Sequence, residues 1–356
     1  MESLDLPHVP CQASRILVIK FRHHGDMLLT TPVIHSLKAA WPHAQIDVLL
    51  YEETRAMLGD HPDIHQIYAI DRRWKKQGVR YQLGQEWRLM NTLRKRRYDI
   101  VINLADQWRS AIITRFTGAR VRLGFDFPKR QGALWKRCHT QLVSTAGHST
   151  QHTVEQNLSL LDPLKLPVRQ DNVRMHYSTN DREEALRLAG AEDYIVVQPT
   201  SRWFFKCWSE DKFAAALQGL VDDGQRIVLT SGPDSKEIAM VDGIIKRLTF
   251  RDSVISLAGQ LTLTQLAALI DGARLFIGVD SVPMHMAAAL QTPTVALFGP
   301  SKLVFWRPWQ VNGEVIWAGD YASLPDPDSI DTKTGERYLD AIPPDVVLTA
   351  ARRLLQ

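Results

Sequence analysis

The sequence has few cysteines and no long apolar segment. Cys11, Cys138 and Cys207 are the only cysteines in 356 residues, too few and too scattered for a disulfide framework or a zinc site. No apolar run approaches the roughly 18 residues that a transmembrane helix needs. The apolar run at residues 16–19 is too short for the core of a signal peptide. We therefore expect a cytoplasmic protein in a reducing compartment.

Three common catalytic motifs are absent as well. The sequence lacks the Gly-x-Gly-x-x-Gly loop of dinucleotide-binding folds, the Walker A loop that binds nucleotide phosphates, and the His-Glu-x-x-His pair of zinc proteases. Their absence weakens an assignment to the dehydrogenases, the kinases or the metalloproteases.

The sequence does contain enough apolar residues for two domains, and its charge is divided unevenly. Hydrophobic residues make up 45% and charged residues 23% of the chain, as in globular proteins, and the length exceeds one ordinary core. Residues 1–172 hold 25 basic and 16 acidic residues, a balance of +9; residues 173–356 hold 18 and 23, a balance of −5. The basic half indicates an anionic partner (nucleic acid, a phosphorylated sugar or a membrane surface) or simply a solvated basic face.

Strand and helix patterns alternate along both halves. Short β-branched runs predict strands at residues 15–21, 46–50, 67–70, 100–104, 121–124, 194–198, 226–230, 254–257, 275–279 and 294–298. Apolar residues at helical spacing predict helices at residues 27–41, 85–96, 110–116, 181–188, 210–220, 235–248, 264–271, 284–290 and 344–355. The polar, proline-containing residues 163–179 indicate a linker.

This alternation predicts an α/β protein with two Rossmann-like, doubly wound domains that face each other across a cleft. We expect an N-terminal domain at residues 1–172 and a C-terminal domain at 173–356. The final helix, 344–355, is a candidate for packing back on the first domain. Because doubly wound sheets bind ligands at the carboxyl ends of their strands, each domain can hold one reactant.

The first candidate site follows the first predicted strand. Gly25 permits a tight turn and a close approach of the backbone to a ligand. The carboxylate of Asp26, at the same strand end, has the chemistry of a general base for a hydroxyl group. The alternative is that Asp26 only caps the helix predicted to follow.

A second candidate site follows the first strand of the C-terminal half. The hydroxyls of Thr200 and Ser201, with Lys206 close to a predicted helix start, suit a phosphate group. Ordinary turn and capping chemistry is the alternative.

A third candidate site is the next strand-to-helix turn. It contains Ser231 and Gly232, with Glu237 about one turn into the helix, where a carboxylate suits the hydroxyls of a ribose. The alternative is an acidic residue that stabilises the helix N-terminus.

The fourth candidate site is the most specific. Asp280, Ser281 and His285 cluster at a strand end and in the first turn of a helix, and the small residues 287–289 allow that helix to pack closely on the sheet. Backbone N–H groups at such a helix start suit a diphosphate.

These segments together resemble the lipopolysaccharide heptosyltransferases of glycosyltransferase family 9. The resemblance covers residues 16–309, and the four sites occur in the family's order, followed by similar segments at 293–300 and 306–308. Residues 20–33 are most similar to the enzyme of this family that adds the third, branching heptose to the second heptose of the core.

The resemblance implies a GT-B architecture and an inverting, metal-independent reaction. The donor would be ADP-L-glycero-D-manno-heptose, and the acceptor would be the phosphorylated inner core of lipopolysaccharide, at its second heptose. It implies no cofactor, no bound metal and no nucleic acid. It also implies a cytoplasmic protein in peripheral contact with the inner membrane.

The resemblance also assigns roles to residues. Asp26 would be the general base, and Lys206 would assist catalysis by holding the diphosphate. The implied donor-binding residues are Thr200, Ser201, Lys206, Ser231, Gly232, Glu237 (or its neighbour Lys236), Asp280, Ser281 and His285. The implied acceptor-binding residues are Arg72, Arg73 and Lys76, for which a solvated surface is the alternative.

One residue departs from the family pattern, and two other functions remain open. Val282 stands where the family usually has glycine, and its side chain would hinder the approach of the backbone to a phosphate. Asp280 and His285 are therefore the stronger candidates at that turn. The other functions are a sugar-nucleotide 2-epimerase of the same architecture and a non-catalytic carbohydrate-binding protein.

Overall fold

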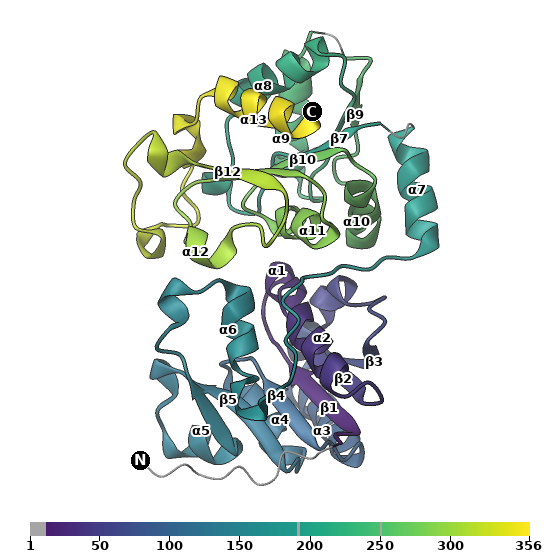
Figure 1. Ribbon diagram of the computed structural model, residues 1–356, viewed down its shortest axis with the longest axis vertical. Helices are drawn as coiled ribbons and strands as arrows, with labels where there is room; N and C mark the ends of the chain where they lie inside the picture. The colour runs from purple at the N-terminus through teal and green to yellow at the C-terminus, as the bar shows by residue number, and fades with distance from the viewer. Residues whose placement is uncertain (1–11, 191–192, 250) are drawn as a thin grey trace. The chain divides into compact units, whose positions relative to one another are not determined.

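The computed structural model describes residues 12–190, 193–249 and 251–356. The chain forms two compact units, Met1–Arg174 and Met175–Gln356, so the division falls two residues after the predicted boundary. Each unit is a parallel sheet with helices packed on it (Figure 1), which confirms the predicted α/β class.

The first unit contains a six-stranded parallel sheet in the order β3-β2-β1-β4-β5-β6. Its strands are β1 (Arg15–Ile19), β2 (Gln45–Tyr51), β3 (Ile64–Ile70), β4 (Ile100–Asn103), β5 (Val121–Asp126) and β6 (Gln141–Ser144). Its α-helices are α1 (His24–Leu28), α2 (Thr31–Ala40), α3 (Val79–Lys95), α4 (Trp108–Phe116), α5 (Ala133–Cys138) and α6 (Thr153–Ser159). Its 3₁₀ helices are η1 (Glu52–Met57), η2 (Arg72–Gln77), η3 (Pro128–Arg130), η4 (His148–Thr150) and η5 (Asp162–Leu164).

The second unit repeats this topology in the order β12-β11-β10-β7-β8-β9. Its strands are β7 (Ile195–Gln198), β8 (Ile227–Leu229), β9 (Val254–Ser256), β10 (Leu275–Val279), β11 (Thr294–Phe298) and β12 (Gly313–Trp317). Its α-helices are α7 (Thr179–Ala189), α8 (Glu210–Asp222), α9 (Ser235–Arg247), α10 (Leu263–Asp271), α11 (Val282–Leu290), α12 (Leu303–Trp306) and α13 (Pro344–Leu355). Its 3₁₀ helices are η6 (Phe204–Lys206), η7 (Ala318–Asp320), η8 (Pro327–Ser329) and η9 (Tyr338–Ala341).

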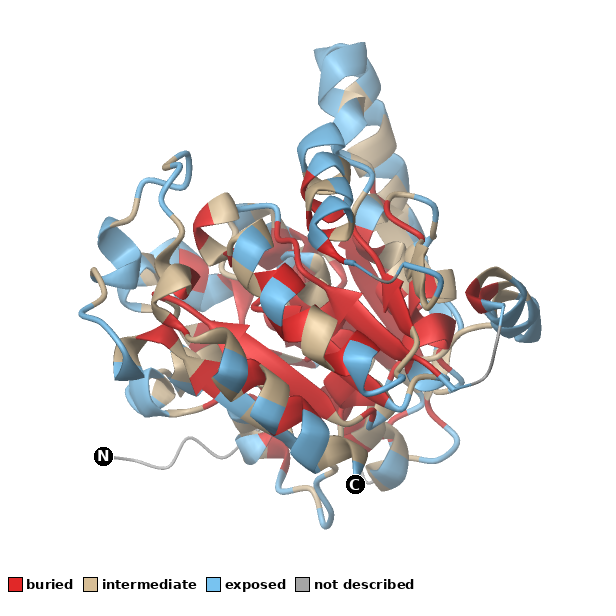
Figure 2. Cartoon of the chain, turned by 90° about the horizontal axis from the view of Figure 1, so that it is seen from above, coloured by how far each residue is buried: buried red, intermediate tan, exposed pale blue. Residues whose placement is uncertain are grey.

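Burial on both faces explains why the central strands are continuous apolar runs. The strands β4, β7, β10 and β11 are buried at every position, and Figure 2 shows buried residues concentrated on the sheets and on the helix faces that cover them. The amphipathic helix α13 packs on α8 and on the strands β10 to β12 of its own unit. Cys138 and Cys207 are buried free thiols, and Cys11 lies outside the described residues.

The segment predicted as one helix at residues 27–41 is two helices, α1 and α2. Pro32 lies in the first turn of α2, where its missing N–H costs no helical hydrogen bond. The interpretation of Asp26 as a helix cap is wrong, because the N-cap residue of α1 is His23 and Asp26 lies inside the helix. The Asp26 side chain is therefore available for another role.

Several elements were not predicted from the sequence. These are the short elements α5, β6, α6, α12 and β12 and the 3₁₀ helices. Between η5 and α7 the described chain forms no helix or strand, in agreement with the predicted linker. In the part of the chain that the structure describes, no helix combines the length and the apolar character needed to cross a bilayer.

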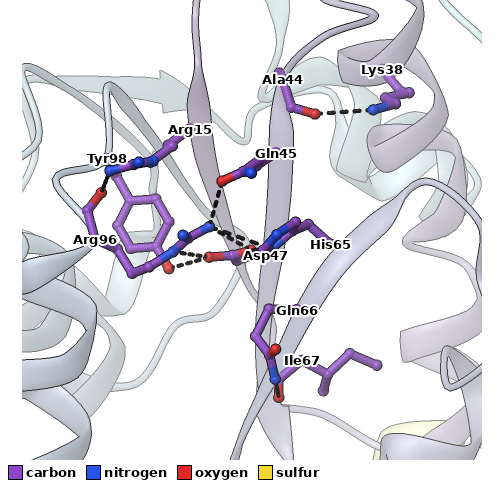
Figure 3. Close-up of polar contacts among 10 residues, drawn as sticks. All are labelled: Arg15, Lys38, Ala44, Gln45, Asp47, His65, Gln66, Ile67, Arg96 and Tyr98. Atoms are coloured by element: carbon purple, nitrogen blue, oxygen red, sulfur yellow. Dashed lines mark hydrogen bonds and ion pairs between the residues drawn. The ribbon is translucent and has the colours of Figure 1, made fainter.

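A buried carboxylate holds together the amino-terminal edge of the first sheet. Asp47, near the start of β2, is completely buried and accepts hydrogen bonds from Arg96 Nε (2.9 Å), Tyr98 Oη (2.7 Å) and His65 Nδ1 (3.1 Å). Figure 3 shows these three side chains converging on Asp47, with Gln45 bound to the same guanidinium group. Burial, followed by the hydrogen bond to Asp47, raises the pKa of Tyr98. The network joins β2, β3 and the segment before β4.

We expect Asp47→Ala to destabilise the first unit strongly. Removing one partner of a buried ion pair leaves the guanidinium of Arg96 without its counter-charge, which typically costs about 3–5 kcal/mol. The midpoint of urea unfolding at neutral pH measures the effect. The control is Asp60→Ala, at an exposed carboxylate, which should change stability by less than about 0.5 kcal/mol. Equal effects of both substitutions would contradict a structural role for the network.

Candidate active site

Several of the predicted site residues lie where the strand order of each sheet reverses. In the first sheet β1 pairs with both β2 and β4, and in the second sheet β7 pairs with both β8 and β10. The loops after such a strand pair diverge, and in open α/β sheets ligands bind there. Asp26 follows β1, the loop at Thr200 follows β7, and Asp280 follows β10.

Asp26 lies half-buried in α1, immediately beyond the carboxyl end of β1. Its backbone carbonyl accepts a hydrogen bond from Thr30 Oγ1 at 2.9 Å, which ties α1 to the start of α2. Among the residues that the structure describes, its side chain makes no hydrogen bond or ion pair. A half-buried carboxylate without a protein partner, at a ligand-binding strand end, has the exposure that a general base requires.

The structure adds Lys20 to this site, a residue that the sequence reasoning missed. Lys20 directly follows β1, is buried, and donates a hydrogen bond from Nζ to Asn157 Oδ1 of α6 at 3.0 Å. Burial lowers the pKa of Lys20 to about 8, and the negative charges of Asp26 and Asp106 oppose that shift. The position of Lys20 at the end of an apolar strand was the feature of the sequence that could have indicated its place in this site.

Asp106 is the second carboxylate near Lys20, and it was also missed. It lies beyond the carboxyl end of β4, the strand next to β1, and forms an ion pair with Lys129. Burial acts to raise the pKa of Asp106, but the hydrogen bond from Lys129 and the charge of Arg22 outweigh it, so the pKa is lowered. Lys20 therefore experiences the negative charge of a residue on each side of the reversal.

The predicted acceptor-binding residues lie in η2 and line a polar cavity of about 600 Å³. The other lining residues are Glu52, Glu53 and Asp71. Arg72 forms an ion pair with Glu53, and Arg73 forms one with Asp71 at 2.8 Å, which lowers the pKa of the Asp71 carboxyl. Three acidic and three basic groups balance, so the cavity is less positive than the sequence implied.

One basic group of this cavity differs from the other two. Within the described chain, Lys76 makes no hydrogen bond or ion pair. The cavity is also linked to the Asp26 segment, because His24 Nε2 contacts the backbone carbonyl of Glu53 at 2.8 Å. Burial lowers the pKa of His24, so a neutral imidazole is favoured there. The helix that carries Asp26 is thereby fixed to a wall of the cavity.

In the second unit an ion pair connects the two loops at the reversal of strand order. Lys206 Nζ lies 2.6 Å from Asp280 Oδ2, although 74 residues separate them in the sequence. The same carboxylate oxygen accepts a hydrogen bond from Ser301 Oγ at 2.6 Å, and the Lys206 ammonium lies 5.1 Å from the centre of the Trp203 ring. Both charged side chains are largely buried. Ser301 follows β11 and was not predicted.

Glu237 is held by the loops after β7 and β8. Its Oε2 accepts hydrogen bonds from Thr200 Oγ1 (2.5 Å) and from the backbone N–H of Gly232 (3.1 Å). A Cβ atom at Gly232 would lie 3.0 Å from Glu237 Oε1, so a side chain there would crowd this contact. Lys236, the alternative to Glu237 in the sequence, is exposed and contributes its backbone N–H to the cap from Asp234.

The remaining predicted donor-binding residues lie on the same strand ends. The hydroxyl of Ser231 donates to the carbonyl of Gly232, and the backbone N–H of Ser201 is directed at Cys207 Sγ (3.2 Å). The Ser281 Oγ atom is buried, and within the described residues it has no hydrogen-bond partner. Buried hydroxyls usually have a partner, so this oxygen is suited to a ligand.

His285 and Val282 lie in the first turn of α11. His285 is buried, and its ring stands edge-on to Trp306 with 6.3 Å between ring centres. Val282 is the first residue of α11 and is half-buried, followed by a proline in the first helical turn.

Comparisons with known proteins show the family of this chain. The family model of glycosyltransferase family 9 (heptosyltransferase) matches residues 86–334, or 249 of the 356 residues. Lipopolysaccharide heptosyltransferase 3 of Escherichia coli is 43% identical over 338 residues, which cover 94% of this chain and 97% of that protein.

Solved structures confirm the fold. The structure of the glycosyl transferase family 9 protein from Veillonella parvula DSM 2008 aligns with a TM-score of 0.81 and 23% identity, covering 96% of this chain and 97% of that one. The Escherichia coli heptosyltransferase WaaC with ADP aligns with a TM-score of 0.75 and 21% identity, covering 96% and 99%.

The family match and the 43% identity each extend over most of the chain, and the family match includes the strand ends of the second unit that carry predicted site residues. They favour glycosyl transfer over the epimerase and the non-catalytic binding protein. This chain therefore belongs to glycosyltransferase family 9, the heptosyltransferase family, and is a glycosyltransferase.

Proposed function

We propose that this protein transfers L-glycero-D-manno-heptose from ADP-heptose to the inner core of lipopolysaccharide, as the third, branching heptose on the second heptose. The 43% identity to lipopolysaccharide heptosyltransferase 3 over nearly the whole chain supports this assignment. The observation that carries it is the Lys206–Asp280 pair beside the Ser281 hydroxyl, which has no hydrogen-bond partner among the described residues; this arrangement suits a phosphorylated sugar.

Lys206 and the strand ends of the second unit hold the donor in this proposal. The ammonium group of Lys206 meets the charge that develops on the diphosphate as ADP leaves, and preformed positive groups are effective in a partly buried site. Thr200, Ser201, Ser281 and His285 contact the phosphates.

The heptose and the ribose of the donor both carry hydroxyl groups, which require hydrogen-bond acceptors on the protein. Lys206 Nζ and Ser301 Oγ both bind Oδ2 of the Asp280 carboxylate, so its orientation is fixed for heptose hydroxyls. Glu237 is held by Thr200 and Gly232 and serves the ribose, beside Ser231. The reaction proposed needs no metal, because Lys206 supplies the positive charge.

Asp26 activates the acceptor in this proposal. Its carboxylate takes the proton of the acceptor hydroxyl, the oxygen bonds to the anomeric carbon, and the bond from that carbon to the diphosphate oxygen breaks. Attack from the face opposite ADP inverts the anomeric configuration. Arg72, Arg73 and Lys76 contact phosphate groups of the core.

The lipid-anchored acceptor gives the protein its proposed location. We place it at the cytoplasmic face of the inner membrane, in peripheral contact through its basic first unit. Phosphorylated lipids attract basic surfaces electrostatically, which is sufficient for reversible binding.

Transfer onto defined acceptors tests the proposed function. Purified protein with ADP-heptose should add one heptose to a lipopolysaccharide that already carries two core heptoses, as measured by mass spectrometry. Addition only to acceptors with no heptose or one heptose would retain the family and refute the branching position. Conversion of UDP-GlcNAc without an acceptor would instead support the epimerase.

We expect Asp26→Asn to abolish transfer while donor affinity is preserved. The amide keeps the shape of the carboxylate but cannot accept the proton, so kcat should fall about 10²–10⁴-fold. Calorimetric titration with ADP measures donor affinity, and single-turnover assays measure transfer. If both fell together, Asp26 would have a structural role instead.

We expect Lys206→Met to weaken donor binding. Losing a hydrogen bond to a charged group costs about 1.5–3 kcal/mol, so the Kd for ADP-heptose should rise about 10- to 150-fold. The matched control is Lys246→Met, at an exposed lysine near the end of α9. An unchanged Kd in the Lys206 variant, with native circular dichroism, would refute its phosphate-binding role.

A further inference from the structure

The helix α3 is unusual because almost none of it is buried. Of its 17 residues, Val79–Lys95, Leu93 is the one classed as buried. A helix whose face is packed on a core buries a continuous stripe of side chains. Exposed and intermediate positions make up the rest of α3. Its first half therefore presents its side chains to the surroundings.

An apolar stripe lies on this exposed surface. Val79, Leu83 and Trp87 are spaced four residues apart, so they share one face of α3. Their exposed fractions are 72%, 61% and 60%, among the highest of the large apolar side chains in the described chain. Exposed Ile112 lies on α4, which packs against α3. Contiguous exposed apolar residues mark interaction surfaces.

The segment that carries this stripe is strongly basic. Residues 72–95, comprising η2 and α3, contain eight basic residues and one acidic residue, a balance of +7. The basic residues are Arg72, Arg73, Lys75, Lys76, Arg80, Arg88, Arg94 and Lys95. The one acidic residue, Glu86, is paired with Arg109 of α4 at 2.8 Å. Arg72 and Arg73 are paired with Glu53 and Asp71, so Lys75, Lys76, Arg80 and Arg88 carry the positive charge beside the apolar stripe.

We propose that η2 and α3 form a docking surface for an anionic lipid bilayer. The stripe of Val79, Leu83 and Trp87 would enter the boundary between headgroups and acyl chains, where tryptophan is favoured. Arg80 and Arg88, one residue after Val79 and Trp87, would keep their charges among the lipid phosphates while their aliphatic stems cover apolar surface.

The positive charge of the surface formed by η2 and α3 favours a lipid bilayer over a protein partner. The one acidic residue of this segment, Glu86, is paired with Arg109. A basic surface interleaved with aliphatic and indole side chains complements a bilayer that is anionic at its surface and apolar inside. This inference deepens the proposed function and rests on it for its purpose, because the proposed acceptor is itself a lipid. The binding step can be measured without any transfer.

Sedimentation with vesicles tests the docking surface. The full-length protein should bind vesicles that contain phosphatidylglycerol, and should bind neutral phosphatidylcholine vesicles at least tenfold more weakly. Leu83→Asn with Trp87→Asn, and separately Arg80→Gln with Arg88→Gln, should each reduce binding at least tenfold. The control combines Leu134→Asn with Arg137→Gln on α5, at residues of similar exposure, and should bind like the wild type.

A second assay separates this inference from the proposed function. The variant that combines Leu83→Asn with Trp87→Asn should transfer heptose to a water-soluble, deacylated acceptor at the wild-type rate. With the acceptor embedded in anionic vesicles, it should transfer heptose more slowly than the wild type. Absence of transfer by the wild type on both acceptors would refute the proposed function and leave vesicle binding as the test of the surface. The docking surface would be refuted if both double variants bound vesicles as well as the wild type. It would also be refuted if the variants lost self-association of the protein but kept lipid binding.

Discussion

Parallel pairing of β1 with β4 and of β7 with β10 is the constraint on which both candidate sites depend. Parallel neighbours align their carboxyl ends, so loops that are far apart in sequence emerge at one edge of the sheet. This places Asp106 near Lys20 in the first unit and Asp280 beside Lys206 in the second. The apolar strands therefore have a direct chemical consequence, because they fix where the polar loops must meet.

Each unit has a largely buried lysine near carboxylates at this edge of its sheet, but the two lysines have different polar partners. Lys206 has a direct ion pair with Asp280, which is shared with Ser301. Lys20 has an amide partner, Asn157, and only the longer-range fields of Asp26 and Asp106, so burial dominates and lowers its pKa to about 8. The proposed donor site places the Lys206 ammonium group where a diphosphate would need a positive charge. Lys20 forms no ion pair with Asp26 within the described residues. The carboxylate of Asp26, the proposed general base, therefore stays accessible to the acceptor.

The sequence predicted the strands more reliably than the contacts that hold the sites. Strands such as β10 and β11, and the last helix α13, were predicted at their observed bounds, because strong apolar patterns define them. The split between α1 and α2 was missed, since both carry apolar residues at helical spacing and Pro32 is compatible with either arrangement. The Glu237 contact to Thr200 and the role of Lys20 depend on long-range packing, which has no local signature. The ion pair of Arg72 with Glu53 was hidden for the same reason, whereas the pair of Arg73 with Asp71 joins residues two positions apart and was overlooked.

The Asp47 network lies at the amino-terminal edge of the first sheet, whereas Asp26 follows the carboxyl end of β1. The residues of this stabilising network are thus separated from Asp26, the residue proposed to act on the acceptor. Substitutions in the loops beyond the strand ends can accumulate without weakening the buried network. Because of this separation, acceptor preference can change between related transferases at a small cost in folding stability.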